Sequence, residues 1–383
     1  MLFNSFTFIA FFAVVLSVHH FSGIGWRGKK AFLLAASYLF YAAWSPPFVL
    51  LIWFSTVVDW TLAKRMARTE SPSARKTLVT LSLVANLGLL GYFKYGGFLL
   101  DTFVQLAGAI GIQYQPVDWG IVLPVGISFY TFQTLSYTID IYRKELEPAE
   151  SFLDFALFVT FFPQLVAGPI VRASEFLPQL TKPRRGTPDQ IGWGLVLLII
   201  GLFSKVVVAD SWMAPVADRG DDSANLAGLT DAWLGTLAFS AQIFYDFAGY
   251  STCAIGAALT LGFVLPDNFR FPYAATGFSD FWRRWHISLS SWLRDYLYIP
   301  LGGNRRGNVR TYVNLMLTML LGGLWHGAAW RFVVWGGLHG TYLAMERWIN
   351  PPPARALPDI LFRVALTHVL VLFTWVFFRA EDF

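Results

Sequence analysis

The sequence predicts an all-α membrane protein, a bundle of helices that crosses a lipid bilayer many times. The chain has 383 residues, of which 55% are hydrophobic and only 14% are charged. Its mean hydropathy is +0.50. A soluble domain carries about 25% charged residues. This chain therefore has too few polar side chains to cover a water-exposed surface, and lipid must cover much of it.

Long apolar segments run along the whole chain. A membrane-spanning helix needs about 20 mostly apolar residues. Candidate segments begin near Leu2, Ala31, Phe48, Leu78, Phe98, Gly120, Phe152, Ile191, Asp231, Tyr312 and Leu361. We expect about ten spans, give or take two, because segment boundaries are the weakest part of such a prediction. No basic residue precedes the first apolar run, which is therefore expected to be a retained span and not a cleaved signal. Residues 1–383 are expected to form one integral-membrane domain.

Prolines interrupt two of these segments. Ser-Pro-Pro at 45–47 divides the apolar stretch 31–63 into two short helices, and Pro163 and Pro169 interrupt the segment 152–171. Non-helical backbone at membrane depth persists only where protein buries it or where it lines a cavity. We therefore expect 152–171 to form a re-entrant hairpin and not a plain span.

The charges between the apolar segments indicate orientation and exclude nucleic acid as the main partner. Basic loops remain in the cytoplasm, and the basic stretches are 26–30, 64–76, 171–186 and 266–311. The loop 210–231 is acidic and is expected outside; its charges are Asp210, Asp218, Arg219, Asp221, Asp222 and Asp231. The net charge of +5 then concerns loop placement and anionic lipid. The single cysteine, Cys253, excludes an internal disulfide and is expected to pack in the interior.

The stretch 278–298 predicts one amphipathic helix at the membrane interface. Its apolar residues recur at steps of three and four: Phe278, Phe281, Trp282, Trp285, Leu289, Trp292, Leu293 and Tyr296. Ser279 is a candidate N-cap. The aromatic side chains would lie among lipid chains, and the arginines would face the headgroups. His286 falls at the edge of the apolar face and is expected to point into protein.

A second histidine lies in a segment that has no other ionisable group. Residues 321–330 read LGGLWHGAAW, with His326 between glycines that permit a helix or a substrate to approach closely. An intramembrane ionisable residue is by default functional. A desolvated imidazole stays neutral, which suits a general base. His339, in WGGLHGTY, has a similar setting and is a rival.

Other chemistries lack their motifs. The histidines have neither the close ligand spacing nor the flanking carboxylates of a metal site, so we expect no bound metal. The chain has no nucleophile elbow, no Walker A loop and no dinucleotide fingerprint. These absences disfavour the common hydrolase, ATP-driven and dinucleotide chemistries.

Four stretches together resemble the membrane-bound O-acyltransferase family. They are 123–143, 161–172, 268–305 and 320–340. The likeness is closest to the bacterial branch with the alginate O-acetylation protein and the D-alanyl transfer protein of teichoic acids. Members of this branch commonly continue with more hydrophobic helices, so a chain that ends VFFRAEDF is expected to be a fragment, a form truncated at its C-terminus or a short member of the branch.

The resemblance implies a fold, a reaction and a site. It implies a helical bundle around a central tunnel, with re-entrant and interfacial helices, in the bacterial inner membrane. By motif match His326 is the catalytic base and His286 the second family position, whereas His339 is structural. The expected residues for donor binding are Arg283, Arg284, Trp285, Trp325, Arg305 and Arg306.

The implied substrates are an acyl donor and a hydroxyl acceptor. The donor would be a cytoplasmic thioester, such as acetyl-coenzyme A or an acylated carrier protein, and no cofactor would stay bound. The acceptor would be a cell-surface polysaccharide such as alginate, or a periplasmic partner that modifies the polymer. Two alternatives stay open at this stage: a transporter of a polysaccharide or lipid intermediate, and a non-catalytic subunit of a polymer-secretion complex.

Overall fold

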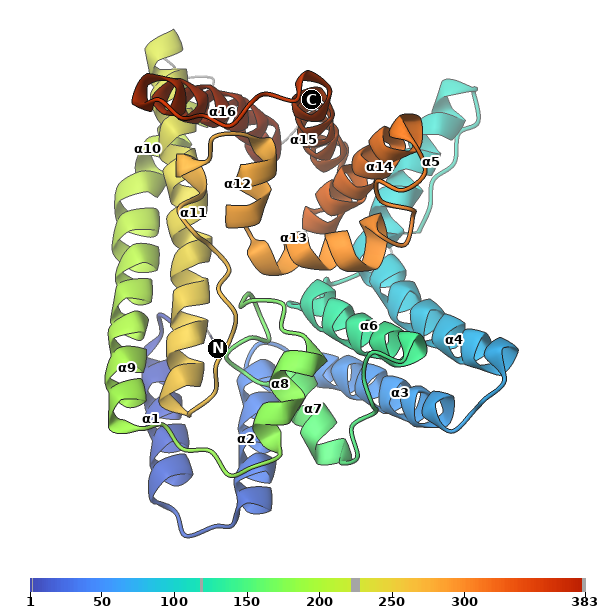
Figure 1. The fold of residues 1–383 in the computed structure, drawn as a ribbon, viewed down its shortest axis with the longest axis vertical. Helices are drawn as coiled ribbons and strands as arrows, with labels where there is room; N and C mark the ends of the chain where they lie inside the picture. The colour runs from blue at the N-terminus through green and yellow to red at the C-terminus, as the bar shows by residue number, and fades with distance from the viewer. Residues whose placement is uncertain (2, 118–119, 222–227, 381–383) are drawn as a thin grey trace.

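The computed structural model describes residues 1, 3–117, 120–221 and 228–380. These residues form helices joined by loops, and no strand occurs among them (Figure 1). The predicted all-α fold class is therefore confirmed. The predicted start at Leu2 and the acidic residue Asp222 lie outside the described residues.

The α-helices are α1 (Phe6–Phe21), α2 (Trp26–Ala42), α3 (Val49–Ala67), α4 (Pro72–Leu90), α5 (Gly96–Ala109), α6 (Ile127–Arg143), α7 (Phe152–Thr160), α8 (Ala173–Leu180), α9 (Pro188–Leu202), α10 (Ala214–Asp221), α11 (Leu229–Thr260), α12 (Phe278–Arg284), α13 (Ile287–Leu293), α14 (Asn308–His326), α15 (Trp330–Ile349) and α16 (Leu357–Arg379). Short 3₁₀ helices are η1 (Pro46–Phe48) and η4 (Pro272–Ala274), and π-helical segments are η2 (Gly91–Tyr95), η3 (Phe203–Met213) and η5 (Arg294–Tyr298).

Four helices in the described part of the chain are long and apolar enough to cross a membrane. They are Pro46–Ala67, Pro72–Ala109, Pro188–Gly220 and Leu357–Arg379. The count of about ten spans is therefore not confirmed. The separate segments predicted near Leu78 and Phe98 are wrong, because both belong to one continuous helix of 38 residues.

Two of the long helices contain π-helical turns. The turn η2 joins α4 to α5, and Figure 1 shows α5 leaving α4 at an angle. The turn η3 joins α9 to α10. A π-turn inserts an extra residue and is a recognised cause of helix bending, often at functional sites. Each of these turns carries one lysine, Lys94 in η2 and Lys205 in η3.

Helices α9 and α11 run side by side along the long axis of the molecule (Figure 1). Glycines on both helices permit this close contact. A Cβ added to Gly201 would lie 2.6 Å from the carbonyl oxygen of Gly249, and one added to Gly256 would lie 2.6 Å from that of Gly194. Because real Cβ atoms do not approach so closely, larger residues at these positions would separate the two helices.

The segment 152–172 is not a plain span, as the prolines predicted. Helix α7 ends at Thr160, and a non-helical stretch leads to α8 at Ala173. This stretch is buried, and side chains satisfy its backbone: Ser37 Oγ accepts from the Phe162 N–H at 3.1 Å, and Ser288 Oγ accepts from the Ile170 N–H at 2.9 Å. The irregular backbone is thus surrounded by protein, as required at membrane depth.

The single amphipathic helix predicted for 278–298 is wrong. The chain breaks between α12 and α13, where His286 takes a left-handed backbone conformation with φ +42°. Ser279 is not the N-cap; Gly277 holds that position, and the Glu346 carboxylate accepts from the Phe278 and Ser279 N–H groups. The expected lipid-facing aromatics instead pack in the protein interior, as the 2% exposure of Trp285 shows.

Helices α14 and α15 form a tightly packed pair that holds His326. Gly323 of α14 and Gly336 of α15 face one another, and a Cβ added to Gly323 would lie 3.2 Å from the Gly336 Cα. A Cβ added to Gly336 would lie 3.0 Å from the Met319 carbonyl carbon and 3.2 Å from the Leu320 Cα. Of the two roles predicted for these glycines, close helix contact is therefore the one observed.

We predict that Gly336→Ala destabilises the protein by about 1–3 kcal/mol, because its new methyl group meets the backbone of α14, which cannot give way locally. Gly337→Ala is the matched control, since its Cβ would meet only the Leu320 Cδ2 at 3.6 Å, an ordinary contact. Thermal unfolding in detergent should show a lower Tm for Gly336→Ala only. Equal Tm values for the two variants would contradict the close packing.

Candidate active site

A cavity of about 390 Å³ reaches His326. Its walls come from the end of α14, the turn η2, the loop before α6, the first turn of α6, and helices α11 and α16. The lining residues are Lys94, Leu123, Pro124, Val125, Gly126, Ile127, Ser128, Phe129, Ile243, Asp246, Phe247, Trp285, Trp325, His326, Trp375 and Phe378. The cavity is thus mostly apolar with a few polar groups, as is usual for ligand-binding sites.

His326 is the last residue of α14 and is held by aromatic packing. Its ring meets Trp335 edge-on at 5.0 Å and Phe378 at 5.3 Å between ring centroids. The side chain is half-buried, and its ring nitrogens have no hydrogen-bond partner among the described residues. The imidazole is therefore fixed in place while its nitrogens stay available to a ligand in the cavity.

His286 is fully buried and is oriented by Asn268. The His286 Nδ1 lies 3.1 Å from Asn268 Oδ1, and the Asn268 amide nitrogen donates to Ser251 Oγ at 3.1 Å. Because an amide oxygen can only accept, Nδ1 must carry the proton. Nε2 then presents a lone pair, and it has no partner among the described residues.

Trp325 separates the two histidines. Its ring centroid lies 5.6 Å from that of His286 and 5.0 Å from that of His326. The structure therefore brings the two histidines into one aromatic cluster, one facing the cavity and one behind Trp325. His339 is also buried, but it lies 3.0 Å from Thr374 Oγ1 and does not line the cavity.

The residues predicted to bind a donor divide into two groups. Trp285 and Trp325 line the cavity at His326. Arg283 lines a different cavity of about 410 Å³, on the α12–α13 side, together with Arg294 and three serines. Arg284 is paired with Asp280 at 2.8 Å. Arg305 and Arg306 are exposed and line neither cavity.

Two site residues escaped the sequence analysis. Lys94 is the only charged residue between Lys76 and Asp101, and that isolation was a usable signal. Asn268 had no signal, because its role depends on a backbone break at His286 that the periodicity did not indicate. Among the described residues no cluster of three or more His, Cys, Asp or Glu side chains could hold a metal.

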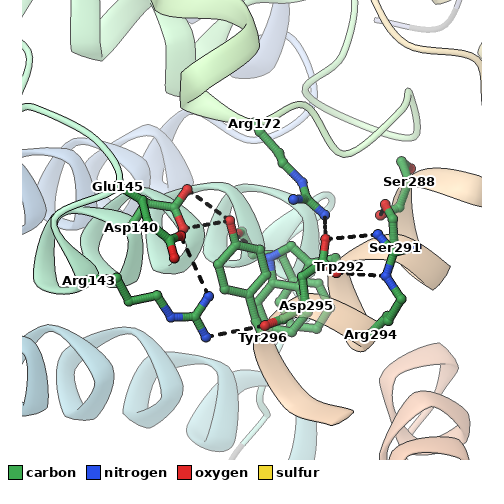
Figure 2. A network of polar contacts seen from close by, with 11 residues as sticks. Asp140, Arg143, Glu145, Arg172, Ser288, Ser291, Trp292, Arg294, Asp295 and Tyr296 are labelled. Carbon is green, nitrogen blue, oxygen red and sulfur yellow. Dashed lines mark hydrogen bonds and ion pairs between the residues drawn. The ribbon is translucent and has the colours of Figure 1, made fainter. Parts of the chain in front are cut away.

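A polar network surrounds Tyr296 and Asp295, outside the cavity at His326 (Figure 2). The guanidinium groups of Arg143 and Arg172 each lie 5.3 Å from the ring centroid of Tyr296. The Tyr296 hydroxyl donates to the Asp140 carboxylate at 2.8 Å, and Arg172 pairs with Asp295 at 2.6 Å. These residues line a cavity of about 620 Å³.

Stacked rings connect this network with the histidines. Tyr296 packs on Trp292 at 5.1 Å, Trp292 stacks on Phe132 at 3.9 Å, and Phe132 packs on Trp325 at 5.7 Å. The Trp292 N–H donates to the Phe132 carbonyl at 2.9 Å and fixes the stack. The interior between the two sites is therefore a continuous ladder of aromatic side chains.

Asp295 is the charged residue that holds the network together. Burial alone would raise the pKa of its carboxyl, but hydrogen bonds from Arg294 and Arg172 outweigh this effect and hold the pKa below its ordinary value. The ion pair with Arg172 links η5 to the residue that precedes α8.

Fold and site together define a class: an all-α membrane protein with two histidines around an apolar cavity. The family model of the membrane-bound O-acyltransferases matches residues 143–378. The probable alginate O-acetylase of Azotobacter vinelandii is 43% identical over 391 residues, covering 100% of this chain and 76% of that protein. The peptidoglycan O-acetyltransferase of Helicobacter pylori is 39% identical over 382 residues, covering 92% and 71%.

A more distant relative matches about two thirds of the chain. The teichoic acid D-alanyltransferase of Bacillus subtilis is 29% identical over 283 residues, covering 68% of this chain and 69% of that protein. The chain belongs to the membrane-bound O-acyltransferase family. It is an O-acyltransferase, as the resemblance implied.

We predict that Asn268→Leu destabilises the protein by about 1–3 kcal/mol for each buried donor that loses its acceptor. The donors are the His286 Nδ1–H, the Ser288 N–H and the Ser288 hydroxyl. Asn268→Asp keeps an acceptor oxygen and should therefore lose less stability than Asn268→Leu. Chemical denaturation of both variants tests this, and equal losses would show that the acceptor oxygen is unimportant.

We predict that Asp295→Asn lowers the Tm at neutral pH. The pKa of Asp295 is lower in the folded than in the unfolded chain, so its stabilising effect is present above roughly pH 3.9 and is lost as the pH falls through the folded-state pKa. The Tm difference from wild type should therefore disappear in acid. Asp267→Asn, in an exposed pair with Arg270, is the control with little effect. A difference that persists in acid would refute the proposed charge effect.

Proposed function

We propose that this protein transfers an acyl group, acetyl in the first instance, from a cytoplasmic thioester to a hydroxyl of a cell-surface polysaccharide or of a periplasmic relay partner. Relatives named for alginate O-acetylation and peptidoglycan O-acetylation support this acceptor class. Acetyl-coenzyme A or an acylated carrier protein would be the donor. The protein would lie in the bacterial inner membrane as one integral domain, with lipid around it and periplasmic polymer-modifying proteins as partners.

His326 carries the proposed chemistry. Its imidazole lines the cavity and is fixed by aromatic contacts, and its ring nitrogens have no hydrogen-bond partner in the described part of the chain. A neutral imidazole takes the proton of the acceptor hydroxyl while the hydroxyl oxygen bonds to the thioester carbonyl carbon. The carbon–sulfur bond then breaks, and the imidazolium returns the proton to the departing thiolate. The observation that carries the proposal is this single histidine presented to an apolar cavity.

The hydrogen bonding of His286, the second family position, restricts what its imidazole can do. Its Nδ1–H is used by Asn268, so Nε2 can only accept. While neutral it cannot polarise a carbonyl. Its Nε2 is buried and lines neither the cavity at His326 nor the cavity at Arg283. His286 lies behind Trp325, so we propose that it positions Trp325 and does not touch the donor.

The cavity on the α12–α13 side suits the donor. Arg283 has no carboxylate within ion-pair distance in the described part of the chain, and it lies near Ser279, Ser290 and Ser291. Guanidinium groups bind phosphate well. Trp282 of the same cavity packs against Trp335, which contacts His326. The indole rings of Trp282 and Trp335 would thus lie between His326 and a donor whose phosphates bind Arg283.

We predict that His326→Ala lowers the rate of acyl transfer by about 10²–10⁴-fold, the usual contribution of a general base. Purified protein in nanodiscs would receive radiolabelled acetyl-coenzyme A and a soluble acceptor polysaccharide, and labelled polymer would be counted. His368→Ala, a half-buried histidine outside the cavity, is the matched control. Equal rates in wild type and His326→Ala would remove His326 from the mechanism. No transfer by wild type, with acylated carrier protein and candidate periplasmic partner proteins also supplied, would refute the proposed function.

A further inference from the structure

Lys94 is a cation inside the cavity that contains His326. It belongs to the π-turn η2 and is half-buried. Its Nζ donates to the carbonyl oxygen of Trp325 and, at 3.1 Å, to Ser128 Oγ. The Nζ also lies 5.5 Å from the centroid of the Trp325 ring. The ammonium group therefore contacts the residue directly before the proposed base.

Lys94 has no carboxylate within ion-pair distance in the described part of the chain. The acidic residue that shares the cavity, Asp246, pairs with Lys205 of the other π-turn. A cation in the interior of a membrane protein is unfavourable and by default marks a functional site. An ammonium group has three N–H donors, and the two acceptors above leave one for a ligand.

The reaction needs a hydrogen-bond donor for the thioester carbonyl oxygen, and the histidines do not supply one. Attack on a thioester places a negative charge on the carbonyl oxygen, and stabilising that oxyanion is usually the largest catalytic effect. His326 receives a proton in this step, and His286 presents a lone pair. The Trp325 indole N–H is buried and has no acceptor among the described residues, and it carries no charge. Lys94 is the charged hydrogen-bond donor that lines the cavity.

We propose that the Lys94 ammonium group binds the thioester carbonyl oxygen and stabilises the oxyanion that forms there. This proposal rests on the proposed acyl transfer. When the acceptor oxygen bonds to the carbonyl carbon, the carbonyl π electrons move to oxygen and Lys94 donates its free N–H to it. When the carbon–sulfur bond breaks, the electron pair returns to the carbonyl and the thiolate leaves. Lys94 keeps its protons throughout.

A purely structural role for Lys94 is the competing explanation. Trp325 and Leu324 lie in the last turn of α14, where carbonyl groups lack helical partners. The Lys94 ammonium group donates to the Trp325 carbonyl, and the hydroxyl of the neighbouring Tyr95 donates to the Leu324 carbonyl at 2.8 Å. If holding this helix end were the whole function, a neutral hydrogen-bond donor of the same length would serve equally well.

The test replaces Lys94 by cysteine and rebuilds its side chain chemically. The single native cysteine, Cys253, is buried and is first changed to alanine. In this background Lys94→Cys is alkylated either with 2-bromoethylamine, which restores an ammonium group at the length of lysine, or with iodoacetamide, which gives a neutral amide donor of that length. Transfer is measured in the polysaccharide assay, with the Cys253→Ala protein as active reference and His326→Ala as inactive reference.

We expect Lys94→Cys to lower kcat by about 10²–10³-fold with little change in KM, the usual cost of losing an oxyanion donor. The aminoethylated protein should recover activity, and the carbamidomethylated protein should not. Tyr95→Phe, which removes only the neighbouring hydrogen bond, should stay close to the reference. Recovery with both reagents would overturn the proposal in favour of a structural role, and so would full activity of Lys94→Cys. An inactive reference protein, supplied with the same donors and candidate periplasmic partner proteins, would instead refute the proposed function itself.

Discussion

The amide of Asn268 sets the geometry on which the site depends. Its side-chain oxygen accepts from His286 Nδ1 and from both the N–H and the hydroxyl of Ser288. Its backbone oxygen accepts from the Ile287 N–H at 2.9 Å. These bonds hold His286 in the left-handed conformation that a non-glycine residue rarely adopts. Ser288 then accepts from the Ile170 N–H, so one amide connects the break between α12 and α13 to the buried stretch between α7 and α8.

The surroundings of the histidines explain how an apolar protein can prepare a polar reaction. Aromatic rings fix both imidazoles and exclude water, and electrostatic interactions are stronger in such an environment than in water. The polar groups that remain are few and each has a defined orientation. His286 is oriented by an amide, His326 by packing, and Lys94 by a helix end. This arrangement fixes the groups before a substrate arrives, so little reorganisation accompanies reaction.

Sequence alone predicted the parts of this structure that depend on local composition. The apolar content predicted a membrane helical protein, Ser-Pro-Pro at 45–47 marked the boundary between α2 and α3, and His326 was recognised because it is the only ionisable group in its segment. The break at His286 was missed because the apolar spacing of 278–298 is helical throughout, and only the distant Asn268 makes the break favourable. Arg305 and Arg306 line neither cavity, and their binding of a donor stays a prediction, because charge along a chain does not determine which cavity a side chain reaches.

The bent helix that contains Lys94 also relates this protein to the thickness of its membrane. A straight helix of 38 residues would be about 57 Å long, whereas the hydrocarbon core of a bilayer is about 30 Å thick. The π-turn allows the two halves of the helix to take different tilts. Neither half then needs a length equal to the thickness of the hydrocarbon core. Helices of unsuitable length are accommodated by tilting or by local changes in lipid thickness, at a modest energetic cost. A change of tilt in either half would change the angle at this turn, and with it the position of the ammonium group against α14, so acyl chains of different length would be expected to shift it.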